Sequence, residues 1–164
     1  EKDGKKLVVK WLTYPTRQEL PLLAEAAQAS LKEIGIEVDI NNTLDVNEVV
    51  QDASAWDVYA MANVQAPTGD PEYWFRVFAL SDSAKNQGKY SNAQLDALDE
   101  QLSQEFDTAK RADLAVQMQQ ILLDDNAFVF CSFLKMSMIS RSNVSNYTSH
   151  ACDYYQITAD LDIE

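Results

Sequence analysis

Residues 6–40 read KLVVKWLTYPTRQELPLLAEAAQASLKEIGIEVDI, and three different patterns follow one another within them. Residues 6–14 are rich in β-branched and aromatic side chains, which favour a strand. Leucine and alanine then recur at helical spacing until Gly35, a residue type that typically ends a helix in the left-handed conformation. Residues 36–40 alternate apolar and acidic side chains, which predicts a second strand with one wet face. A strand, a helix and a strand joined by short links predict a right-handed crossover and a parallel sheet.

Capping signals mark the starts of the predicted helices. Thr16 and Glu19 have the spacing of a capping box at the first helix, although Pro21 fits a start as late as residue 20. A residue with a short polar side chain that precedes an apolar periodic stretch predicts further helix starts. These predicted starts lie at Asp45, Asp70, Ser91 and Asp107.

Three later apolar runs predict further strands, at residues 56–64, 127–133 and 136–140. The run at 127–133 is nearly continuous, so we expect a strand that is covered on both faces. Cys131 lies in this run and is expected to be a buried, inert thiol. Strands that alternate with helices predict the α/β fold class.

Length and charge exclude several further classes of function. The chain has 164 residues and a net charge of −13, so we expect a single domain whose surface repels nucleic acid and anionic lipid headgroups. No apolar run approaches the roughly 18 residues that a membrane span requires. The sequence starts with a charged turn that leads directly into the first strand. Such a start is expected of a fragment cut from within a longer protein.

Side chains for catalysis or metal binding are scarce. His150 is the only histidine, which excludes a multi-histidine metal site, and Cys131 and Cys152 are too far apart for a CxxC motif. A disulfide between the two cysteines stays open. With only four glycines, a backbone cradle for phosphate is not expected, and no carboxylate pair can be singled out for acid–base catalysis. We therefore expect a binding protein with no cofactor, and not an enzyme.

Two loops are candidates for ligand binding, because ligands of α/β sheets meet the loops beyond the carboxyl ends of the strands. One loop follows the first strand and the other follows the strand at 56–64. They carry a phenol, hydroxyls, a guanidinium and amides, which are suitable for hydrogen bonding to a ligand. The alternative is structural, with Arg17 paired to a helix carboxylate and the amides closing turns. The predicted ligand-binding residues are Tyr14, Thr16, Arg17, Asn63, Gln65 and Thr68.

Four segments also stand out as a set: residues 19–38, 68–71 (Thr-Gly-Asp-Pro), 88–96 (Gly-Lys-Tyr-Ser-Asn-Ala-Gln-Leu-Asp) and 106–114 (Phe-Asp-Thr-Ala-Lys-Arg-Ala-Asp-Leu). In order and spacing they resemble the extracytoplasmic solute-binding proteins of ABC transporters, in the class that binds oligopeptides, dipeptides and nickel complexes (family 5). The resemblance extends across nearly the whole chain.

Members of that family are longer and have two lobes joined by a hinge. The resemblance implies that residues 1–164 form the C-terminal lobe of a periplasmic-binding-protein-like α/β fold, with a mixed sheet flanked by helices. It implies solute capture by hinge closure, without chemistry, and delivery to the permease subunits of an ABC transporter. The N-terminal lobe of the same protein would complete the ligand site. The expected location is extracytoplasmic, either periplasmic or as a cell-surface lipoprotein.

The resemblance also bears on the solute. Peptide binders of the family carry an aspartate that pairs with the α-ammonium of the peptide, with a tryptophan ahead of it, but Pro67 and Val64 occupy those positions here. A buried, unpaired ammonium is costly, which argues against a standard peptide pose. Residues 134–138 and 153–158 are similar to the nickel-type members, in which the metal arrives inside small chelators. A single protein ligand for such a metal could be His150.

The leading hypothesis is therefore the binding of nickel or another chelated metal. Within the family, an oligopeptide or dipeptide binder is the alternative. From other classes, a stand-alone protein-interaction domain and an enzyme with an unrecognised nucleophile stay open.

Overall fold

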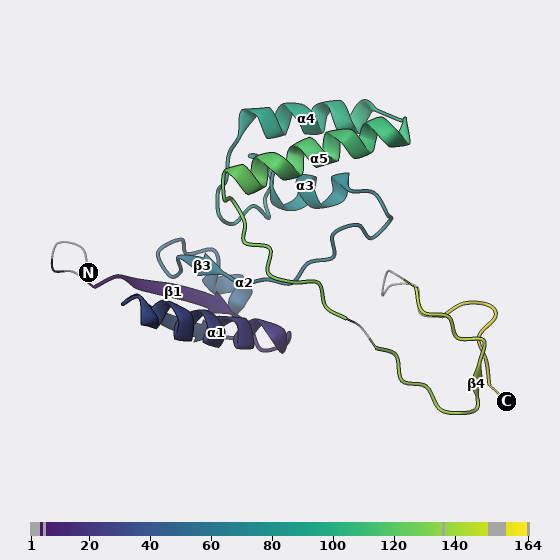
Figure 1. Cartoon of the computed structure of the whole chain (residues 1–164), viewed down its shortest axis with the longest axis horizontal. Coiled ribbons are helices and arrows are strands. Elements are labelled where there is room, and N and C mark those ends of the chain that lie inside the picture. Colours follow the sequence, from purple (N-terminus) through teal and green to yellow (C-terminus); the bar gives the residue numbers. More distant parts are fainter. Residues whose placement is uncertain (1–3, 5, 136, 151–156, 164) are drawn as a thin grey trace. The chain divides into compact units, whose positions relative to one another are not determined.

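A computed structural model describes residue 4 and residues 6–135, 137–150 and 157–163 (Figure 1). The chain forms two compact units, Glu1–Val64 and Gln65–Glu164, which are named here the sheet unit and the helical unit. The assignment of residues 1–164 to a single lobe stays a prediction. None of the helices in the described ranges is long and apolar enough to cross a membrane.

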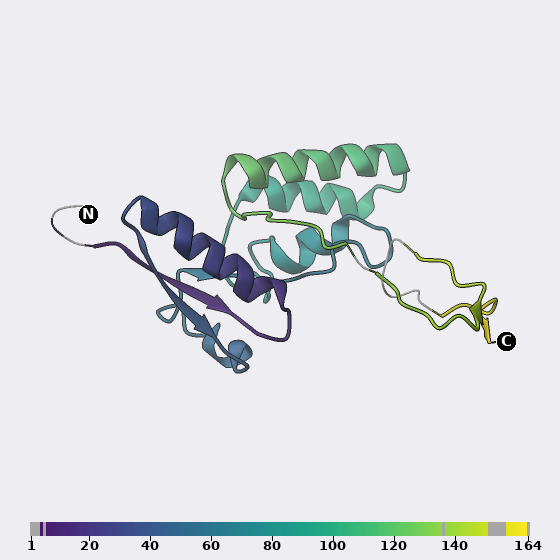
Figure 2. The ribbon, with the colours of Figure 1, turned by 60° about the horizontal axis from the view of Figure 1, so that its bottom comes forward.

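The sheet unit is a strand–helix–strand crossover with a short third strand. Its elements are β1 (Val8–Thr13), α1 (Glu19–Glu33), β2 (Glu37–Asn42), α2 (Val46–Val49) and β3 (Val58–Tyr59). β1 and β2 are parallel, with Val8 opposite Glu37, and β3 is parallel to β1, with Trp11 opposite Val58. The order is β2-β1-β3, and α1 runs alongside the sheet (Figure 2). These findings confirm the predicted crossover and the α/β class, while β3 is shorter than the predicted strand.

The two ends of α1 differ in how well they were predicted. Gly35 takes a φ of +82° just beyond the helix, which confirms the predicted left-handed stop. At the other end the predicted capping box is wrong, because the N-cap is Gln18 and no side chain caps it. A tight turn, in which the Leu20 N–H donates to the Arg17 carbonyl at 3.1 Å, separates Thr16 from the helix start.

A small apolar core supports the middle strand. Leu12 has no exposed surface and packs against Val46 and Val50 from the α2 segment. On α1, Leu20 and Ala24 are buried as well. Burial on this scale stabilises each large aliphatic side chain by about 1.5–3 kcal/mol. This core fixes the carboxyl end of β1, where the first predicted ligand loop begins.

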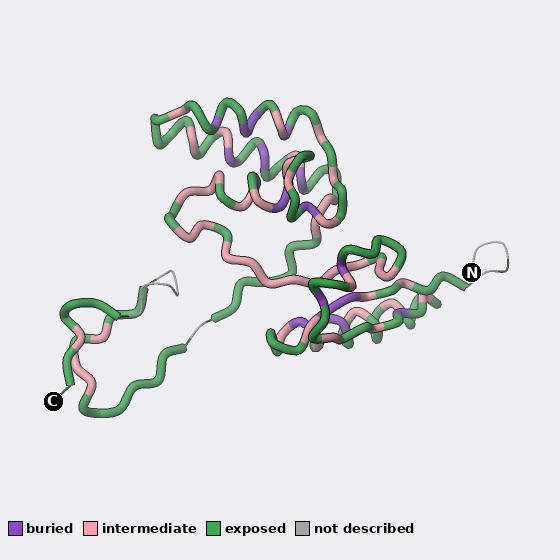
Figure 3. Tube along the Cα trace, turned by 180° about the vertical axis from the view of Figure 1, so that it is seen from behind, coloured by how far each residue is buried: buried purple, intermediate pink, exposed green. Residues whose placement is uncertain are grey.

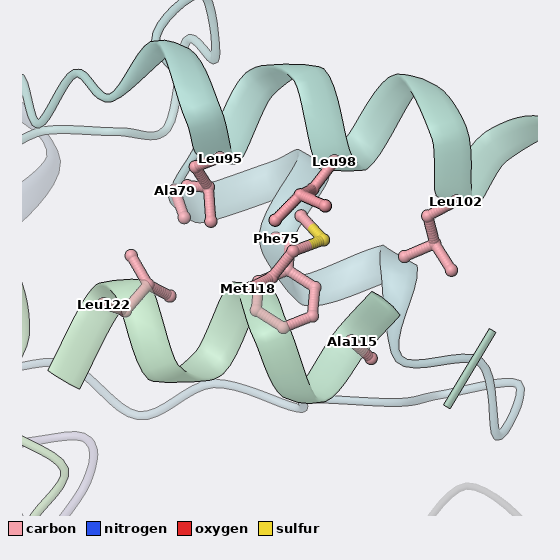
Figure 4. Close-up of a cluster of buried hydrophobic side chains, with 8 residues drawn as sticks. All are labelled: Phe75, Ala79, Leu95, Leu98, Leu102, Ala115, Met118 and Leu122. Carbon is pink, nitrogen blue, oxygen red and sulfur yellow. The ribbon is translucent and has the colours of Figure 1, made fainter. Parts of the chain in front are cut away.

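The helical unit contains α3 (Glu72–Phe78), α4 (Ala93–Gln104), α5 (Thr108–Asp124) and a short antiparallel pair, β4 (Val144–Ser145) and β5 (Asp162–Ile163). α4 and α5 lie side by side and run antiparallel, as predicted, and α5 begins directly after its predicted cap, Asp107 (Figure 1). The three helices bury one apolar cluster between them (Figure 4). Its members are Phe75, Ala79, Leu95, Leu98, Leu102, Ala115, Met118 and Leu122.

The start of α4 differs by one residue from the prediction. Asn92, and not Ser91, is the N-cap, and its side-chain oxygen accepts from the Gln94 N–H at 2.9 Å and from the Leu95 N–H at 3.2 Å. The Ser91 hydroxyl lies instead 3.0 Å from the hydroxyl of Ser81. Both residue types cap helices well, so sequence alone did not distinguish between these neighbours.

Replacing Asn92 by Ala is expected to lower the free energy of unfolding by about 1 kcal/mol, because two N–H groups of the first turn lose their acceptor. Urea denaturation followed by far-ultraviolet circular dichroism measures this change. Gln104→Ala is the matched control, since Gln104 is an exposed residue in the last turn of the same helix. Its replacement should change the stability by less than about 0.5 kcal/mol. Equal effects of the two substitutions would contradict the role of Asn92.

The two strands predicted in the apolar segment after α5 are not formed. Residues 127–135 and 137–140 belong to no strand, and Val129, Phe133 and Ile139 are 87%, 81% and 93% exposed (Figure 3). The prediction of a strand covered on both faces is therefore wrong for the described residues. An apolar run indicates that a segment is to be buried, but a strand also needs a neighbouring strand, and none of the described strands pairs with this one.

The prediction for Cys131 is also wrong. Its thiol is exposed, because no described part of the chain covers the segment that carries it. Cys152 lies outside the described residues, so a pairing between the two cysteines stays an open prediction.

Candidate ligand-binding site

A pocket of about 380 Å³ lies in the sheet unit at the carboxyl ends of parallel strands. Tyr14 follows β1, and Tyr59 is the last residue of β3, which is next to β1 in the sheet. The third wall comes from the segment that joins β2 to α2 and from the first residues of α2. The lining residues are Tyr14, Thr16, Leu44, Val46, Asn47 and Tyr59.

Hydrogen bonds hold these walls in place. The Tyr14 hydroxyl accepts from the Ala62 N–H at 3.2 Å, which ties the chain beyond β3 to the end of β1. The Thr43 N–H donates to the Thr13 carbonyl at 3.0 Å, and the Thr43 hydroxyl accepts from the Asp45 N–H at 3.1 Å. The pocket is therefore largely formed before any ligand arrives, as is usual for small-molecule sites.

Tyr59 is positioned by an aromatic contact. Its ring lies 6.0 Å from that of Trp56, centroid to centroid, and the Trp56 indole N–H donates to the Val50 carbonyl at 3.2 Å. Burial raises the pKa of Tyr59, and the neighbouring Tyr14 raises it further. Tyr59 therefore presents a neutral phenol at physiological pH.

The lining is uncharged. It offers two phenols, a hydroxyl and an amide beside aliphatic side chains. Within the described part of the chain, no group of His, Cys, Asp and Glu side chains is arranged to hold a metal ion. These side chains suit the reversible binding of a ligand through hydrogen bonds and aromatic contact.

Three of the predicted site residues follow β1, and two of them line the pocket. Tyr14 and Thr16 do so. Arg17 is exposed and makes no ion pair with any residue for which the structure gives a position. The alternative in which Arg17 pairs with a helix carboxylate is therefore not supported. The guanidinium is left available to an anionic group.

The second predicted loop is divided between the two units. Asn63 is partly buried in the sheet unit and follows Ala62, whose N–H binds Tyr14. Gln65 and Thr68 are exposed and belong to the helical unit, where the Gly69 N–H closes a turn. The role of these residues in ligand binding stays a prediction.

Leu44, Asn47 and Tyr59 line the pocket but were not predicted. Tyr59 had a usable signal, because it ends the strand next to β1 in a parallel sheet, and the carboxyl edge of such a sheet is where ligands bind. The predicted strand ran on to residue 64, which moved the expected edge too far along the chain. Leu44 and Asn47 follow β2, and nothing in their local sequence marks them.

A second set of polar contacts, named here the ionic network, joins Asp70, Glu72, Arg76, Asp99 and Arg111 in the helical unit. The Arg111 guanidinium donates to both carboxylate oxygens of Asp70 at 2.8 Å and to Glu72 at 2.9 Å. Arg76 lies 2.7 Å from Glu72 and 3.3 Å from Asp99. Asp70 also accepts from the Glu72 N–H at 2.9 Å, but Pro71 occupies the N-cap position of α3 and no side chain caps it, so the predicted start at Asp70 is wrong by one residue.

Two carboxyl groups of the ionic network have opposite pKa shifts. Burial alone would raise the pKa of Asp70, but the bonds from the Glu72 N–H and from Arg111 outweigh it and lower that pKa. Burial raises the pKa of Asp99, and Arg76 opposes this shift without cancelling it. Asp70 is thus held as a carboxylate by its partners.

Acidification is expected to weaken the helical unit through Asp70. Because the folded pKa lies below the unfolded value of about 4, the contribution of Asp70 is present above that value and is lost as the pH falls through the folded pKa. Thermal denaturation between about pH 7 and pH 3 measures this loss. Asp70→Asn should be less stable at neutral pH and lose less on acidification. An unchanged acid response in Asp70→Asn would contradict this prediction.

An acidic hollow of about 460 Å³ also lies in the helical unit. Two of its carboxylates already have partners, since Asp96 accepts from the Ser81 hydroxyl at 2.7 Å and Asp99 pairs with Arg76. His150 is exposed and belongs to no metal-holding cluster among the residues that can be described. Its role as a single metal ligand stays a prediction. The lining of the hollow is Arg76, Leu80, Ser81, Asp82, Asp96, Asp99, Glu100 and Ser103.

Comparison with known proteins identifies relatives of the chain, although no family model matches it. The nickel-binding protein NikA of Staphylococcus aureus is 30% identical over 141 residues, which cover 86% of this chain and 29% of NikA. The dipeptide-binding protein DppE of Bacillus subtilis is 24% identical over 159 residues, which cover 96% of this chain and 29% of DppE. The chain thus spans less than a third of the length of these curated relatives.

Solved structures agree with these relatives. The crystal structure of Staphylococcus aureus NikA in complex with Ni(L-His)2 matches 99% of this chain and 36% of that chain, with a TM-score of 0.78 and 27% identity. A nickel ABC transporter structure from Bacillus halodurans matches 99% of this chain and 34% of its own, with a TM-score of 0.78 and 29% identity. These homologues are two-lobed solute-binding proteins and not enzymes. As the four sequence segments predict, the chain is homologous to NikA, and its structure matches that of family 5 solute-binding proteins of ABC transporters, of which it corresponds to a partial segment.

Proposed function

We propose that the chain is part of a protein that captures a small solute outside the cytoplasm and hands it to the permease of an ABC transporter. The observation that carries this proposal is the homology to NikA over 86% of the chain. The preformed pocket at the carboxyl edge of the sheet supports it, because its uncharged lining suits binding without a chemical step. Closure of two lobes about a hinge would trap the solute.

The proposed solute is nickel, or another metal, inside a small chelator. The NikA relative was crystallised with nickel held by two histidine molecules. In the described ranges of this chain no side-chain cluster could bind a bare metal ion, so the chelator would supply the inner ligands. Hydroxyl groups of Tyr14, Thr16 and Tyr59 and the amide of Asn47 would bind the polar groups of the chelator.

A peptide is the second candidate solute, because DppE is also a relative. The pocket lining contains no carboxylate that could pair with an α-ammonium group. Pro67 and Val64 stand where the resemblance places the aspartate and tryptophan of peptide binders. An unpaired ammonium is costly in a closed site, and peptides therefore rank second.

The rest of the longer protein is proposed to cover the apolar segment after α5. Phe128 and Phe130 pack on Trp74, with ring centroids at 5.1 and 5.6 Å, while Val129 and Phe133 are exposed. Phe130 is still 47% exposed, so the side that carries the two rings is packed only in part, while the opposite side is bare, as in a strand that lacks a neighbour. Relatives about three times as long contain the additional chain that could supply this neighbour.

The proposed location is extracytoplasmic, as a periplasmic protein or a cell-surface lipoprotein. The expected partners are the ABC permease subunits and the N-terminal lobe of the same protein. Nucleic acid is not an expected partner, because a net charge of −13 repels its phosphate backbone.

Calorimetric titration of the full-length protein tests the proposal. Metal-free protein is titrated with nickel plus histidine, with nickel alone, with histidine alone and with a mixed pool of short peptides. Heat with nickel plus histidine is the expected result. Heat with peptides alone would exclude the metal and establish the second candidate, and no heat in any titration would overturn the proposed function.

The pocket makes a second prediction for the same titration. Tyr14→Ala and Tyr59→Ala should each weaken binding at least about tenfold, because a lost aromatic contact and hydrogen bond are together worth roughly 1.4 kcal/mol or more. Tyr73→Ala is the matched control, since Tyr73 is an exposed tyrosine outside the pocket. Arg17→Ala and Gln65→Ala extend the test to the predicted loops. Unchanged affinity in all four site variants would exclude this site.

A further inference from the structure

The Arg111 side chain joins three separate parts of the helical unit. Besides its bonds to Asp70 and Glu72, it donates to the backbone carbonyls of Leu102 and Glu105 at 2.6 and 2.8 Å, at the end of α4. It is mostly buried, with 18% of its side chain exposed. A guanidinium suits this position because its planar fork can bind a carboxylate and backbone carbonyls at the same time.

Through Asp70, Arg111 is connected to the loop from Gln65 to Asp70, which is the part of this network that matters for binding. The Gly69 N–H donates to the Ala66 carbonyl at 3.0 Å, and Gly69 has a φ of +82°, so the chain turns sharply just before Asp70. Gln65 and Thr68 are exposed on this turn. The Asp70 side chain ties the end of the turn both to α3 and to Arg111. The ion pair therefore limits how far the loop can move away from the helices.

We infer that Arg111 is a positioning residue for the ligand loop formed by residues 65–70. This inference rests on the proposed function and on the prediction from sequence that Gln65 and Thr68 contact the solute. A loop that is fixed before binding avoids the entropy cost of being ordered by the ligand, and loss of its anchor reduces the affinity by that amount. Asp70 and Arg111 also lie in two of the four segments that carry the family resemblance, and the structure brings these two segments together.

Substitution of Arg76 distinguishes a positioning role of Arg111 from a role in stability alone. It belongs to the same ionic network, where its ion pairs are with Glu72 and Asp99 and not with Asp70. Arg76→Gln therefore removes ion pairs from the network and leaves the loop anchor in place. A purely structural role for Arg111 predicts that Arg76→Gln and Arg111→Gln behave alike once their different stabilities are taken into account.

The experiment uses the full-length protein and the solute that gives heat with the wild type. Affinity is measured by calorimetry for Arg111→Gln, Arg111→Lys, Arg76→Gln and Asp70→Asn, and for Arg111→Gln combined with Asp70→Asn. Hydrogen exchange of the amides in residues 65–70 and in the centre of α5 is recorded for each variant. Thermal denaturation identifies any variant that is not folded, and the milder Arg111→Lys substitution then replaces Arg111→Gln in the comparison.

The expected result is an affinity at least about tenfold weaker in Arg111→Gln, partly restored in Arg111→Lys and unchanged in Arg76→Gln. Loop amides should exchange about tenfold faster in Arg111→Gln while those in the centre of α5 do not change. The double variant should bind no more weakly than the weaker of the two single variants, because both substitutions remove the same ion pair between Arg111 and Asp70. Unchanged affinity in Arg111→Gln, or equal losses in Arg76→Gln, would overturn the inference. Failure of the wild type to bind any probe would instead overturn the proposed function.

Discussion

Replacing Met118 by Ala is expected to lower the free energy of unfolding of the helical unit by about 3 kcal/mol. Met118 has no exposed surface and lies among the three helices, where its side chain reaches from α5 toward Leu98 and Phe75 (Figure 4). Removing its outer atoms loses their transfer free energy and leaves a cavity that rigid neighbouring helices fill only in part. Because a domain of this size is stable by about 5–15 kcal/mol, the loss is a large fraction of the total.

Denaturation by urea, followed by far-ultraviolet circular dichroism, measures this effect on the whole chain. Val116→Ala is the matched control on the same helix, because Val116 is 62% exposed and Ala is the better helix former. Its effect should stay within about 0.5 kcal/mol. Met118→Leu keeps the volume and should cost less than about 1.5 kcal/mol. A loss in Met118→Ala no larger than that in Val116→Ala would contradict the assignment of Met118 to the core.

The helices were predictable because their signals are local. The apolar spacing that ends at Gly35 and the cap at Asp107 each depend on residues within a turn or two of one another. Errors of one or two residues arose where neighbouring residues compete for the same role. Asn92 took the cap from Ser91 in this way, and a turn at Arg17 displaced the predicted capping box.

The strands and the site depended on partners far away in the sequence. An apolar run predicts burial, but it does not identify the neighbour that provides the burial, and none of the strands in the described ranges pairs with residues 127–133. The carboxyl edge of the sheet was predicted from topology, and this brought Tyr14 and Thr16 into the pocket. Asn47 and Tyr59 meet them only through the strand order β2-β1-β3, and the ends of strands are poorly predicted.

The contact between Asp70 and Arg111 shows the same limitation at the level of one ion pair. Both residues lie in segments that the family resemblance singled out, and Asp70 was predicted as a helix cap. Their bond spans 41 positions of sequence, and no local pattern announces it. Folding places the first turn of α5 against the start of α3, and only this packing turns two separate motifs into one anchor.

The largest expected effect concerns Cys131 and the proposed cover of the apolar segment. In the 164-residue chain its thiol is exposed and should react with a soluble alkylating reagent as fast as a thiol in an unfolded peptide. In the full-length protein, we expect the reaction to be at least about 100-fold slower, because opening a paired strand costs roughly 3 kcal/mol and leaves little thiol accessible. Phe128 and Phe130 pack on Trp74, so Cys131, one residue further along an extended segment, is expected on the opposite side.

Mass spectrometry of the peptide that contains Cys131 follows this thiol alone, in a Cys152→Ser background that removes the second cysteine. The same full-length protein in denaturant is the control, and there the rate should return to that of the short chain. Phe133→Ser, which removes an exposed apolar side chain from the side of the proposed neighbour, should speed the reaction in the full-length protein and leave the short chain unchanged. Equal rates in the native long and short chains would mean that the rest of the protein leaves this segment uncovered. The bare side of the segment would then need another partner, since apolar side chains as exposed as those of Val129 and Phe133 gain free energy from any surface that removes them from water.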